Sequence, residues 1–339
     1  MSGPGTDRLI TVLGASGLLG TAVVAQLAAR PGRLRLVGRR PVTLPENPVA
    51  RIEELTLDLT EPGAVVRAVA GADAVVHLVA HTGGPGTWRV ADGDALAERV
   101  NLGLVCEVID AIRDGHTARW PALLFAGSVS QAARMPVKGA GETPPDQPPT
   151  AYDRHKLAAE QAIEAATAEG IVRGSTLRLS TLYSQGTGST DLDRGVVASM
   201  VRRALDGEPL TLWHGGRAQR DFITVDDAAA AFTAALDALE EVEGRNWEIG
   251  TGDCTSVAEL FTAVAATVAR ITGKPEVPVE DTTPAEFAMP TDQIDFVLSD
   301  LGFQQATGWR ARTPLAEGLA ALTSAVLAER GRPTARTSA

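Results

Sequence analysis

Short apolar runs alternate with segments of helical periodicity from residue 9 to residue 179. Runs such as LITVL at 9–13 have no alternating polar face, which is typical of strands buried on both sides of a parallel sheet. The runs predict strands at residues 9–13, 34–37, 52–57, 74–79, 123–127 and 176–179. The segments between them predict helices at residues 18–30, 61–70, 94–113 and 151–169. This order predicts an α/β fold, a Rossmann-type doubly wound sheet that is mainly parallel.

The second half of the chain mixes helices and short strands less regularly. Helices are expected at residues 195–205, 226–239 and 257–272, and strands at 210–213, 221–225 and 246–249. We interpret residues 1–180 as the Rossmann domain. Strands from later in the chain can also join the sheet of this domain. Residues 181–330 are interpreted as a smaller C-terminal α/β lobe that caps the carboxyl ends of the strands and binds substrate. Residues 331–339 are interpreted as a tail.

Charge and composition disfavour several classes of protein. The chain has 31 Lys plus Arg against 42 Asp plus Glu, a net charge of −11, which disfavours a general nucleic-acid-binding surface. It has no apolar run of about 18 residues, the length of a membrane-spanning helix, and no secretory leader pattern. The two cysteines, Cys106 and Cys254, form no CxxC pair and suggest no disulfide framework. We therefore expect a cytoplasmic globular protein that binds neither nucleic acid nor membrane.

A glycine-rich segment, GASGLLG at 14–20, joins the first predicted strand to the first predicted helix. Gly14 permits a tight turn, Gly17 lets the backbone approach a pyrophosphate, and Gly20 permits close packing of helix on sheet. The helix N-terminus adds unpaired N–H groups and the positive end of its dipole. A glycine-rich turn without a ligand is the alternative. The strand–loop–helix context favours a dinucleotide site, with contacts expected at Gly14, Ser16, Gly17, Leu18 and Leu19.

Two arginines follow the second predicted strand, at the position where an NAD site carries Asp or Glu for the ribose hydroxyls. The residues here are Arg39 and Arg40, with no acidic residue beside them. Because a guanidinium pairs well with a phosphate, the sequence predicts that they bind the 2′-phosphate of NADP(H). The alternative is that both are solvated loop residues, which removes the cofactor preference but not the fold.

Tyr152 and Lys156 form a Y-x-x-x-K pair on a predicted helix, so the two side chains share one face. Lys156 is expected to stabilise a tyrosinate and to lower the pKa of the phenol from its usual value near ~10. Ser128 follows the fifth predicted strand, and its hydroxyl could bind a carbonyl oxygen that gains negative charge during hydride addition. For Ser128 taken singly, an ordinary turn serine is the alternative. Together the three residues predict a catalytic set.

The chain resembles the extended short-chain dehydrogenases/reductases, which include nucleotide-sugar epimerases, dehydratases and ketoreductases. The motifs that carry the resemblance are GASGLLG at 14–20, VVHLVA at 75–80, FAGSVS at 125–130, YDRHK at 152–156, LRLSTLY at 177–183 and RDFITVDD at 220–227. The resemblance implies a seven-stranded Rossmann sheet, the catalytic set above and a lobe that holds a nucleoside-diphosphate sugar. It also implies that the cofactor site extends to Asp58, Leu59, Leu78, Val79, Ala80, Tyr152, Lys156 and Leu182.

Departures from parts of this family narrow the reaction. Ser128 is followed by Val129 and Ser130 rather than by the Asp-Glu pair of sugar dehydratases. The whole pattern is similar to the dTDP-4-keto-6-deoxyhexose 4-ketoreductases of deoxysugar and antibiotic biosynthesis. This implies NADPH-dependent reduction of the C4 ketone of a dTDP-linked 6-deoxy or 2,6-dideoxyhexose. A nucleotide-sugar epimerase with bound NAD(P) and a non-catalytic NADP-binding regulator are the alternatives.

Several other positions carry expectations that follow from the resemblance. Asn101 falls where the family often has a structural asparagine that supports the lysine, with a capping or surface residue as the alternative. The helices at 94–113 and 151–169 form a dimer interface in many relatives, which implies a homodimer, and packing on the sheet is the alternative. His77 and His81 lie across a strand end, so no metal site is expected. Substrate contacts are expected at His81, Ser128, Tyr152, Thr181 and Arg220, the last with an ion pair to Asp221 as its alternative.

Overall fold

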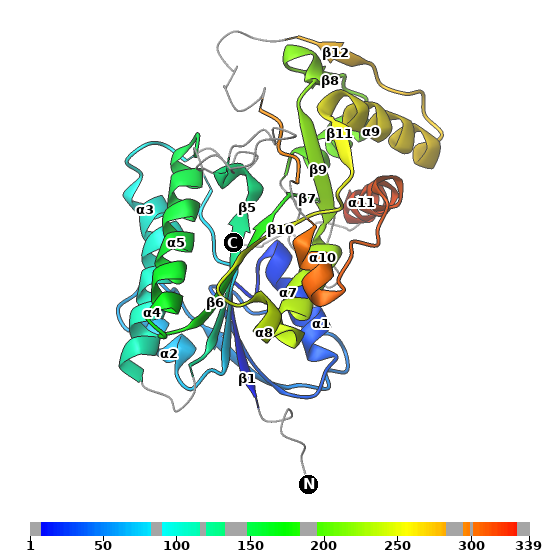
Figure 1. Cartoon of the computed structure of the whole chain (residues 1–339). Coiled ribbons are helices and arrows are strands. Elements are labelled where there is room, and N and C mark those ends of the chain that lie inside the picture. The colour runs from blue at the N-terminus through cyan, green and yellow to red at the C-terminus, as the bar shows by residue number, and fades with distance from the viewer. Residues whose placement is uncertain are drawn as a thin grey trace, which may run out of the picture.

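Seven parallel strands form the central sheet of the protein (Figure 1). The computed structural model describes residues 8–82, 90–115, 120–132, 148–183, 195–282, 294–298 and 301–330, so the expected tail at 331–339 lies outside the described residues. The sheet order is β10-β6-β5-β4-β1-β2-β3, and every neighbouring pair is parallel. Its strands are β1 (Leu9–Leu13), β2 (Arg33–Gly38), β3 (Arg51–Thr56), β4 (Ala74–His77), β5 (Ala122–Ser128), β6 (Arg173–Leu179) and β10 (Asn246–Ile249). The order reverses direction between β1 and β4, which confirms the predicted doubly wound Rossmann sheet. Sheets of this type bind ligands beyond the carboxyl ends of the strands at this point of reversal.

Helices cover both faces of the sheet, as Figure 1 shows. One face carries α1 (Leu18–Ala28), α7 (Val225–Asp237), α8 (Leu239–Val242) and α10 (Gly302–Thr307), and the other carries α2 (Ala64–Val69), α4 (Leu104–Gly115) and α5 (Ala151–Ala168). Side chains alternate between the two faces of a strand, so successive residues of one strand belong to the apolar cores on opposite faces of the sheet. Val12 and Val76 belong to the core under α1 and α7, whereas Leu13 and Val75 belong to the core under α4 and α5. Burial on both faces explains the continuous apolar runs in the sequence.

The predicted helix at 94–113 is interrupted, which corrects the sequence-based prediction. The segment contains α3 (Ala95–Glu98), a π-helical turn η1 (Arg99–Gly103) and then α4. The turn places Asn101 fully inside the protein, where its amide bonds the backbone of His81. A regular α-helical repeat would point this polar side chain in another direction, whereas the π-helical turn lets it enter the core and form hydrogen bonds. π-Helical turns of this kind often occur at functional sites.

The predicted helix at 61–70 also begins later than expected. Its first residue is Ala64, and Gly63 occupies the N-cap position with a φ of +75°. The Thr60 hydroxyl donates to the carboxylate of Asp58 at 2.7 Å. Asp58 therefore organises the turn after β3, and the helix starts only beyond the glycine.

A second, smaller lobe lies beyond the carboxyl ends of the strands (Figure 1). It contains a three-stranded sheet in the order β11-β9-β7 and a parallel pair of β12 with β8. These strands are β7 (Thr181–Tyr183), β8 (Leu210–Leu212), β9 (Gln219–Thr224), β11 (Cys254–Ser256) and β12 (Val279–Asp281). They pack with α6 (Val196–Asp206), α9 (Val257–Thr272) and α11 (Leu315–Arg330) around a separate apolar core. Strands β7, β11 and β12 and helices α10 and α11 were not predicted.

The chain moves repeatedly between the sheet and the second lobe. After β7 and β9 in the lobe it returns to form α7 and β10, and β10 pairs with β6 from Asn246↔Thr176 to Ile249↔Leu179. Trp247 of β10 and Phe232 of α7 are buried in the core beneath α1. The division into residues 1–180 and 181–330 stays a prediction. Strand β10, from the second part of the chain, joins the sheet of the first part.

Candidate active site

The glycine-rich loop has the shape that the motif predicts. The N–H groups of Gly14 and Ala15 both donate to the carbonyl of Val37, at 2.9 and 3.0 Å, which ties the loop to the end of β2. Gly14 has a φ of +85°, and a Cβ there would lie 3.2 Å from the backbone of Leu78. A Cβ on Gly20 would lie 2.1 Å from the carbonyl oxygen of Gly14, so only glycine permits this approach of α1 to the loop.

Helix α1 begins directly after this loop and is open at its N-terminus. Gly17 is its N-cap residue, and no side chain of the described residues caps the helix there. Ser16 lies in the turn, and Leu18 and Leu19 form the first turn, with their N–H groups ahead of the first intrahelical bond from Thr21 to Gly17. The unpaired N–H groups and the helix dipole make this end suited to a pyrophosphate.

The loop after β2 brings positive charge beside the glycine-rich turn. Arg39 and Arg40 are exposed and follow Gly38, whose Cα faces Ser16 so closely that a Cβ would lie 2.6 Å from its hydroxyl. Hydrogen bonds from Thr60, and in addition the charge of Arg39, lower the pKa of Asp58 below its usual value. The arginines thus stand at the end of β2 and beside the end of β3.

The remaining cofactor positions lie at the ends of β3 and β4. Leu59 is buried, which makes it a core contact beneath the turn of Asp58. Leu78 donates its N–H to the carbonyl of Leu13 at 2.9 Å, and Leu78 and Val79 are half-buried against Gly14, whereas Ala80 is exposed. The structure therefore brings this segment against the glycine-rich turn, as expected.

Asn101 fixes the segment after β4. Its side-chain oxygen accepts from the N–H of His81 at 2.7 Å, and its amide nitrogen donates to the carbonyl of His81 at 2.9 Å. The fully buried amide therefore holds the backbone of His81 by two hydrogen bonds. The sequence pointed to Asn101 as a support for Lys156, but the contact it makes is with this loop.

Lys156 is buried between β5 and α5. Its Nζ donates to the carbonyl of Ala126 at 2.8 Å and lies 4.4 Å from the ring centroid of Phe125 and 5.7 Å from that of Tyr152. Burial lowers the pKa of Lys156 to about 7. Burial and the Lys156 charge lower the pKa of nearby His77 to about 3, so this fully buried imidazole is neutral.

The acidity of Tyr152 differs from the sequence-based expectation. Burial, and then the charge of Asp153, raise the pKa of Tyr152 above its usual value. The expected lowering by Lys156 does not dominate because burial disfavours the negative charge of the phenolate. A phenol of raised pKa stays protonated through the neutral range, which is the form that can donate a proton.

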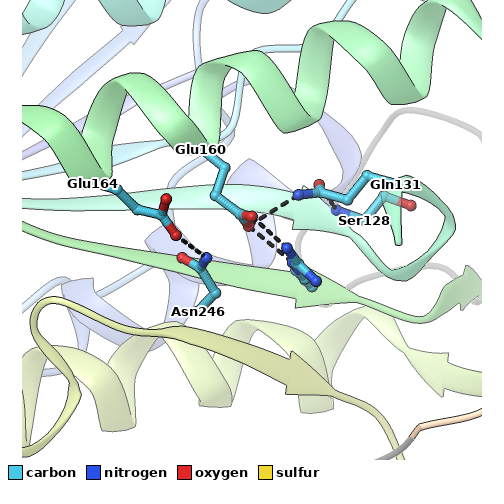
Figure 2. Close-up of polar contacts among 6 residues, drawn as sticks. Ser128, Gln131, Glu160, Glu164 and Asn246 are labelled. Carbon is cyan, nitrogen blue, oxygen red and sulfur yellow. Dashed lines mark hydrogen bonds and ion pairs between the residues drawn. The ribbon is translucent and has the colours of Figure 1, made fainter. Parts of the chain in front are cut away.

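Ser128 ends β5 and caps the short helical turn η2 (Val129–Gln131). Its N–H donates to the side-chain oxygen of Gln131 at 3.0 Å, and Gln131 in turn donates to Glu160 at 2.9 Å (Figure 2). Glu160 is buried on α5 and forms an ion pair with Arg178 of β6. A buried polar network therefore supports the backbone of Ser128 from beneath.

The hydroxyl of Ser128 belongs to a second network that sequence reasoning missed. Ser128 Oγ lies 2.7 Å from Ser130 Oγ, and Ser130 Oγ donates to the carboxylate of Asp153 at 2.5 Å. The other carboxylate oxygen accepts from Thr150, the N-cap of α5, at 2.6 Å. Asp153 is fully buried, and burial raises its pKa above the usual value. Its place directly after Tyr152 was the available signal.

The residues expected to bind substrate or cofactor in the second lobe pack against neighbouring parts of the chain. Thr181 is half-buried and pairs with Phe222 across β7 and β9, and Leu182 packs against the core under α1. The guanidinium of Arg220 lies 4.4 Å from the ring centroid of Phe296 and donates to the carbonyl of Ile294.

The ion-pair alternative for Arg220 named Asp221 as its partner. Neighbouring strand residues point to opposite faces, and the carboxylate of Asp221 accepts instead from Ser180, Thr251 and Gly252, at 2.7–3.0 Å. Asp221 thus joins β9 to the ends of β6 and β10.

Two further observations concern the described residues as a whole. No group of three or more His, Cys, Asp or Glu side chains suited to a metal occurs in this part of the chain. None of its helices combines the length and the apolar character that crossing a membrane requires.

Known proteins resemble the whole chain. It is 26% identical to a dTDP-L-rhamnose 4-epimerase of Burkholderia thailandensis, over 96% of each chain. It is also 26% identical to a dTDP-6-deoxy-L-talose 4-dehydrogenase (NAD(P)(+)) of Kitasatospora kifunensis, over 93% of this chain and 95% of that one. Among solved structures, the UDP-glucose 4-epimerase of Thermus thermophilus in complex with NAD matches with 25% identity and a TM-score of 0.74, over 96% of this chain and 100% of that chain.

The family model supplies the assignment. The model of the NAD dependent epimerase/dehydratase family matches residues 10–250, which include the glycine-rich loop, the Ser128 turn, the Tyr152–Lys156 pair and strand β10. The seven-stranded parallel sheet agrees with this match. The chain therefore belongs to the NAD dependent epimerase/dehydratase family, the extended short-chain dehydrogenases/reductases.

Proposed function

We propose that the protein reduces, with NADPH, the C4 ketone of a dTDP-linked 4-keto-6-deoxy or 2,6-dideoxyhexose. The observation that carries the proposal is the position of Lys156. Its ammonium bonds the carbonyl two residues before Ser128 and lies 5.7 Å from the ring of Tyr152. Lys156 and the ring of Tyr152 therefore lie near the carboxyl end of β5, the strand that Ser128 ends, which supports a shared role for the three residues.

The residues of the loop fit a dinucleotide. The positive φ of Gly14, the tight approach of Gly20 and the uncapped N-terminus of α1 leave space and N–H groups for a pyrophosphate. Arg39 and Arg40 at the end of β2 fit the extra phosphate of NADP(H), for which a carboxylate would be repulsive. Gly14, Ser16, Gly17, Leu18 and Leu19 would hold the pyrophosphate, with Leu78 and Val79 beside it.

The proposed chemistry assigns each residue one task. When bound, NADPH supplies a hydride to the ketone carbon. Tyr152, protonated because its pKa is raised, donates a proton to the ketone oxygen as that oxygen gains negative charge. Ser128 holds the same oxygen. Lys156 holds the ribose and adds positive charge near the phenol. His81, Thr181 and Arg220 contact the sugar nucleotide.

Two observations disfavour a dehydratase and a non-catalytic regulator. No acid–base pair follows Ser128, which disfavours dehydration. The intact Tyr152–Lys156 pair disfavours a non-catalytic regulator. A 4-epimerase is the second candidate, because a dTDP-L-rhamnose 4-epimerase matches 96% of the chain. The homodimer stays a prediction.

The test mixes purified protein, NADPH and dTDP-4-keto-6-deoxyglucose and follows the nicotinamide absorbance together with the sugar product. A reductase consumes one NADPH for each alcohol formed. An epimerase converts a dTDP-hexose to its C4 epimer without net consumption of NADPH, and that outcome would replace the proposal.

Tyr152→Phe tests the proton donor in the same assay. It should slow reduction about 10²- to 10⁴-fold, the usual contribution of a general acid. Tyr183→Phe is the matched control, because Tyr183 is the other of two tyrosines and lies in the core of the second lobe. If both variants reduce the ketone at the wild-type rate, Tyr152 is not the acid.

A further inference from the structure

The hydroxyl of Ser128 has only one hydrogen, and its neighbours determine where that hydrogen points. Ser128 Oγ accepts from the N–H of Ser130 at 3.3 Å and shares a hydrogen bond of 2.7 Å with Ser130 Oγ. The next hydrogen bond in the chain, between Ser130 and Asp153, determines which of these two hydroxyls is the donor.

An ionised Asp153 fixes the direction of this chain. A carboxylate only accepts, so it takes the single hydroxyl hydrogen of Ser130 at 2.5 Å and that of Thr150 at 2.6 Å. Ser130 then has no hydrogen left for Ser128, and Ser128 must donate to Ser130. Its hydrogen therefore points toward Ser130, and Ser128 cannot donate to a ketone oxygen.

A protonated Asp153 reverses the chain. The carboxylic acid donates to Ser130, Ser130 donates to Ser128, and the hydrogen of Ser128 becomes available to a substrate oxygen. No heavy atom has to move, because each hydrogen bond keeps its two partners and exchanges only donor and acceptor. The full burial of Asp153 favours the neutral form.

We propose that Asp153 is a positioning residue whose protonation sets whether Ser128 donates a hydrogen bond to the substrate or withholds it. The inference rests on the proposed ketone reduction for its kinetic consequence. The protonated form is the more active one, because a donor at the developing oxyanion stabilises the transition state. Reduction should therefore slow as rising pH ionises Asp153.

The carboxylates and guanidinium groups near this end of α5 pair with other groups, cap a helix or are exposed. Arg154 pairs with Asp92 and weakly favours the ionised form of Asp153. On the neighbouring elements, Asp94 caps α3, Glu98 is exposed, Arg99 pairs with Glu107 at 2.7 Å, and Glu160 pairs with Arg178. The charge of Asp153 also raises the pKa of Tyr152, so one test variant has to keep this charge and break the chain of hydrogen bonds elsewhere.

Two variants test the chain of hydrogen bonds independently. Asp153→Asn keeps the shape of the side chain and can donate to Ser130 at every pH. Ser130→Ala removes the acceptor of the Ser128 hydrogen. Both should lose the fall in kcat that the wild type shows as Asp153 ionises, and at alkaline pH both should reduce the ketone about tenfold faster than the wild type or more. Ser130→Thr retains a hydroxyl and should restore the wild-type profile.

The opposite results are equally clear. If folded Asp153→Asn and Ser130→Ala keep the wild-type pH profile, or if both are slow at every pH while Ser130→Thr is active, the carboxylate does not act through Ser128 and the inference is wrong.

An infrared measurement separates this inference from the proposed function. The carbonyl band of a protonated buried acid should titrate in the wild type, vanish in Asp153→Asn and shift in frequency in Ser130→Ala, with no substrate present. If the band behaves so but no ketone is reduced, the proposed function fails and the hydrogen-bond chain stands. Absence of a titrating band overturns the inference even in an active reductase.

Discussion

The buried ion pair beneath Ser128 gives the sharpest stability prediction. Glu160 of α5 is 1% exposed and Arg178 of β6 is 9% exposed, and the carboxylate accepts from Nε of Arg178 at 2.9 Å and from Gln131 at 2.9 Å. Glu160→Gln preserves the size of the side chain but removes the negative charge that Glu160 holds against the guanidinium. Breaking such a pair from one side costs about 3–5 kcal/mol, because the remaining charge stays buried.

Glu164 provides the matched control on the same helix (Figure 2). It lies one turn further along, is exposed and accepts a hydrogen bond from Asn246 of β10 at 2.5 Å. Glu164→Gln should change the free energy of unfolding by less than about 0.5 kcal/mol, as exposed substitutions usually do. The same chemical change is thus made twice, once in the core and once at the surface.

Urea unfolding, followed by circular dichroism at neutral pH, measures both variants. Glu160→Gln should lower the unfolding midpoint strongly, and Glu164→Gln should not. Because Gln131 links Glu160 to the N–H of Ser128 at 3.0 Å, Glu160→Gln should also lower kcat more than it changes KM. Two variants of equal, small effect on stability would show that the pair is not a structural requirement.

Three further predictions follow from the site. Burial lowers the pKa of Lys156 to about 7, so between about pH 7 and 10 the unfolded chain binds the extra proton. The free energy of unfolding of the wild type should therefore rise with pH relative to that of Lys156→Met, by a few kcal/mol over this range. If the two free energies change with pH in parallel, the reasoning is wrong. Gly20→Ala places a Cβ 2.1 Å from the Gly14 carbonyl and should weaken NADPH binding in a fluorescence titration, whereas Gly115→Ala, whose Cβ has open space, should not. Arg39→Ala with Arg40→Ala should reduce the preference for NADPH over NADH at least about tenfold in kcat/KM, because the 2′-phosphate loses its charged partners; an unchanged preference would place the selectivity elsewhere.

The sheet could be predicted from the sequence because its signals are local. Strands β1, β4 and β5 are apolar runs ended by glycine or polar residues, and the loop between β1 and α1 combines tight turns that only glycine permits. Strand β7, three residues long, lacks such a signal because its pairing with β9 depends on residues about forty positions away.

The parts of the site that were missed depend on tertiary contacts. The π-helical turn at Asn101 exists because the amide finds His81, and the Asp153 network exists because β5 brings Ser130 against α5. The pKa of Tyr152 was expected to fall because Lys156 follows it by four residues in the sequence, whereas the burial that raises this pKa becomes visible only in three dimensions.

The position of β10 has a consequence for biosynthesis. Its four residues lie at the edge of the sheet beside β6, although about 67 residues separate the two strands in the chain. The edge of β6 therefore stays unpaired on the ribosome until Ile249 has emerged. During that interval the nascent chain exposes a strand edge of the kind that pairs with other chains. We therefore expect chaperones to bind the nascent chain at this stage more readily than the finished molecule.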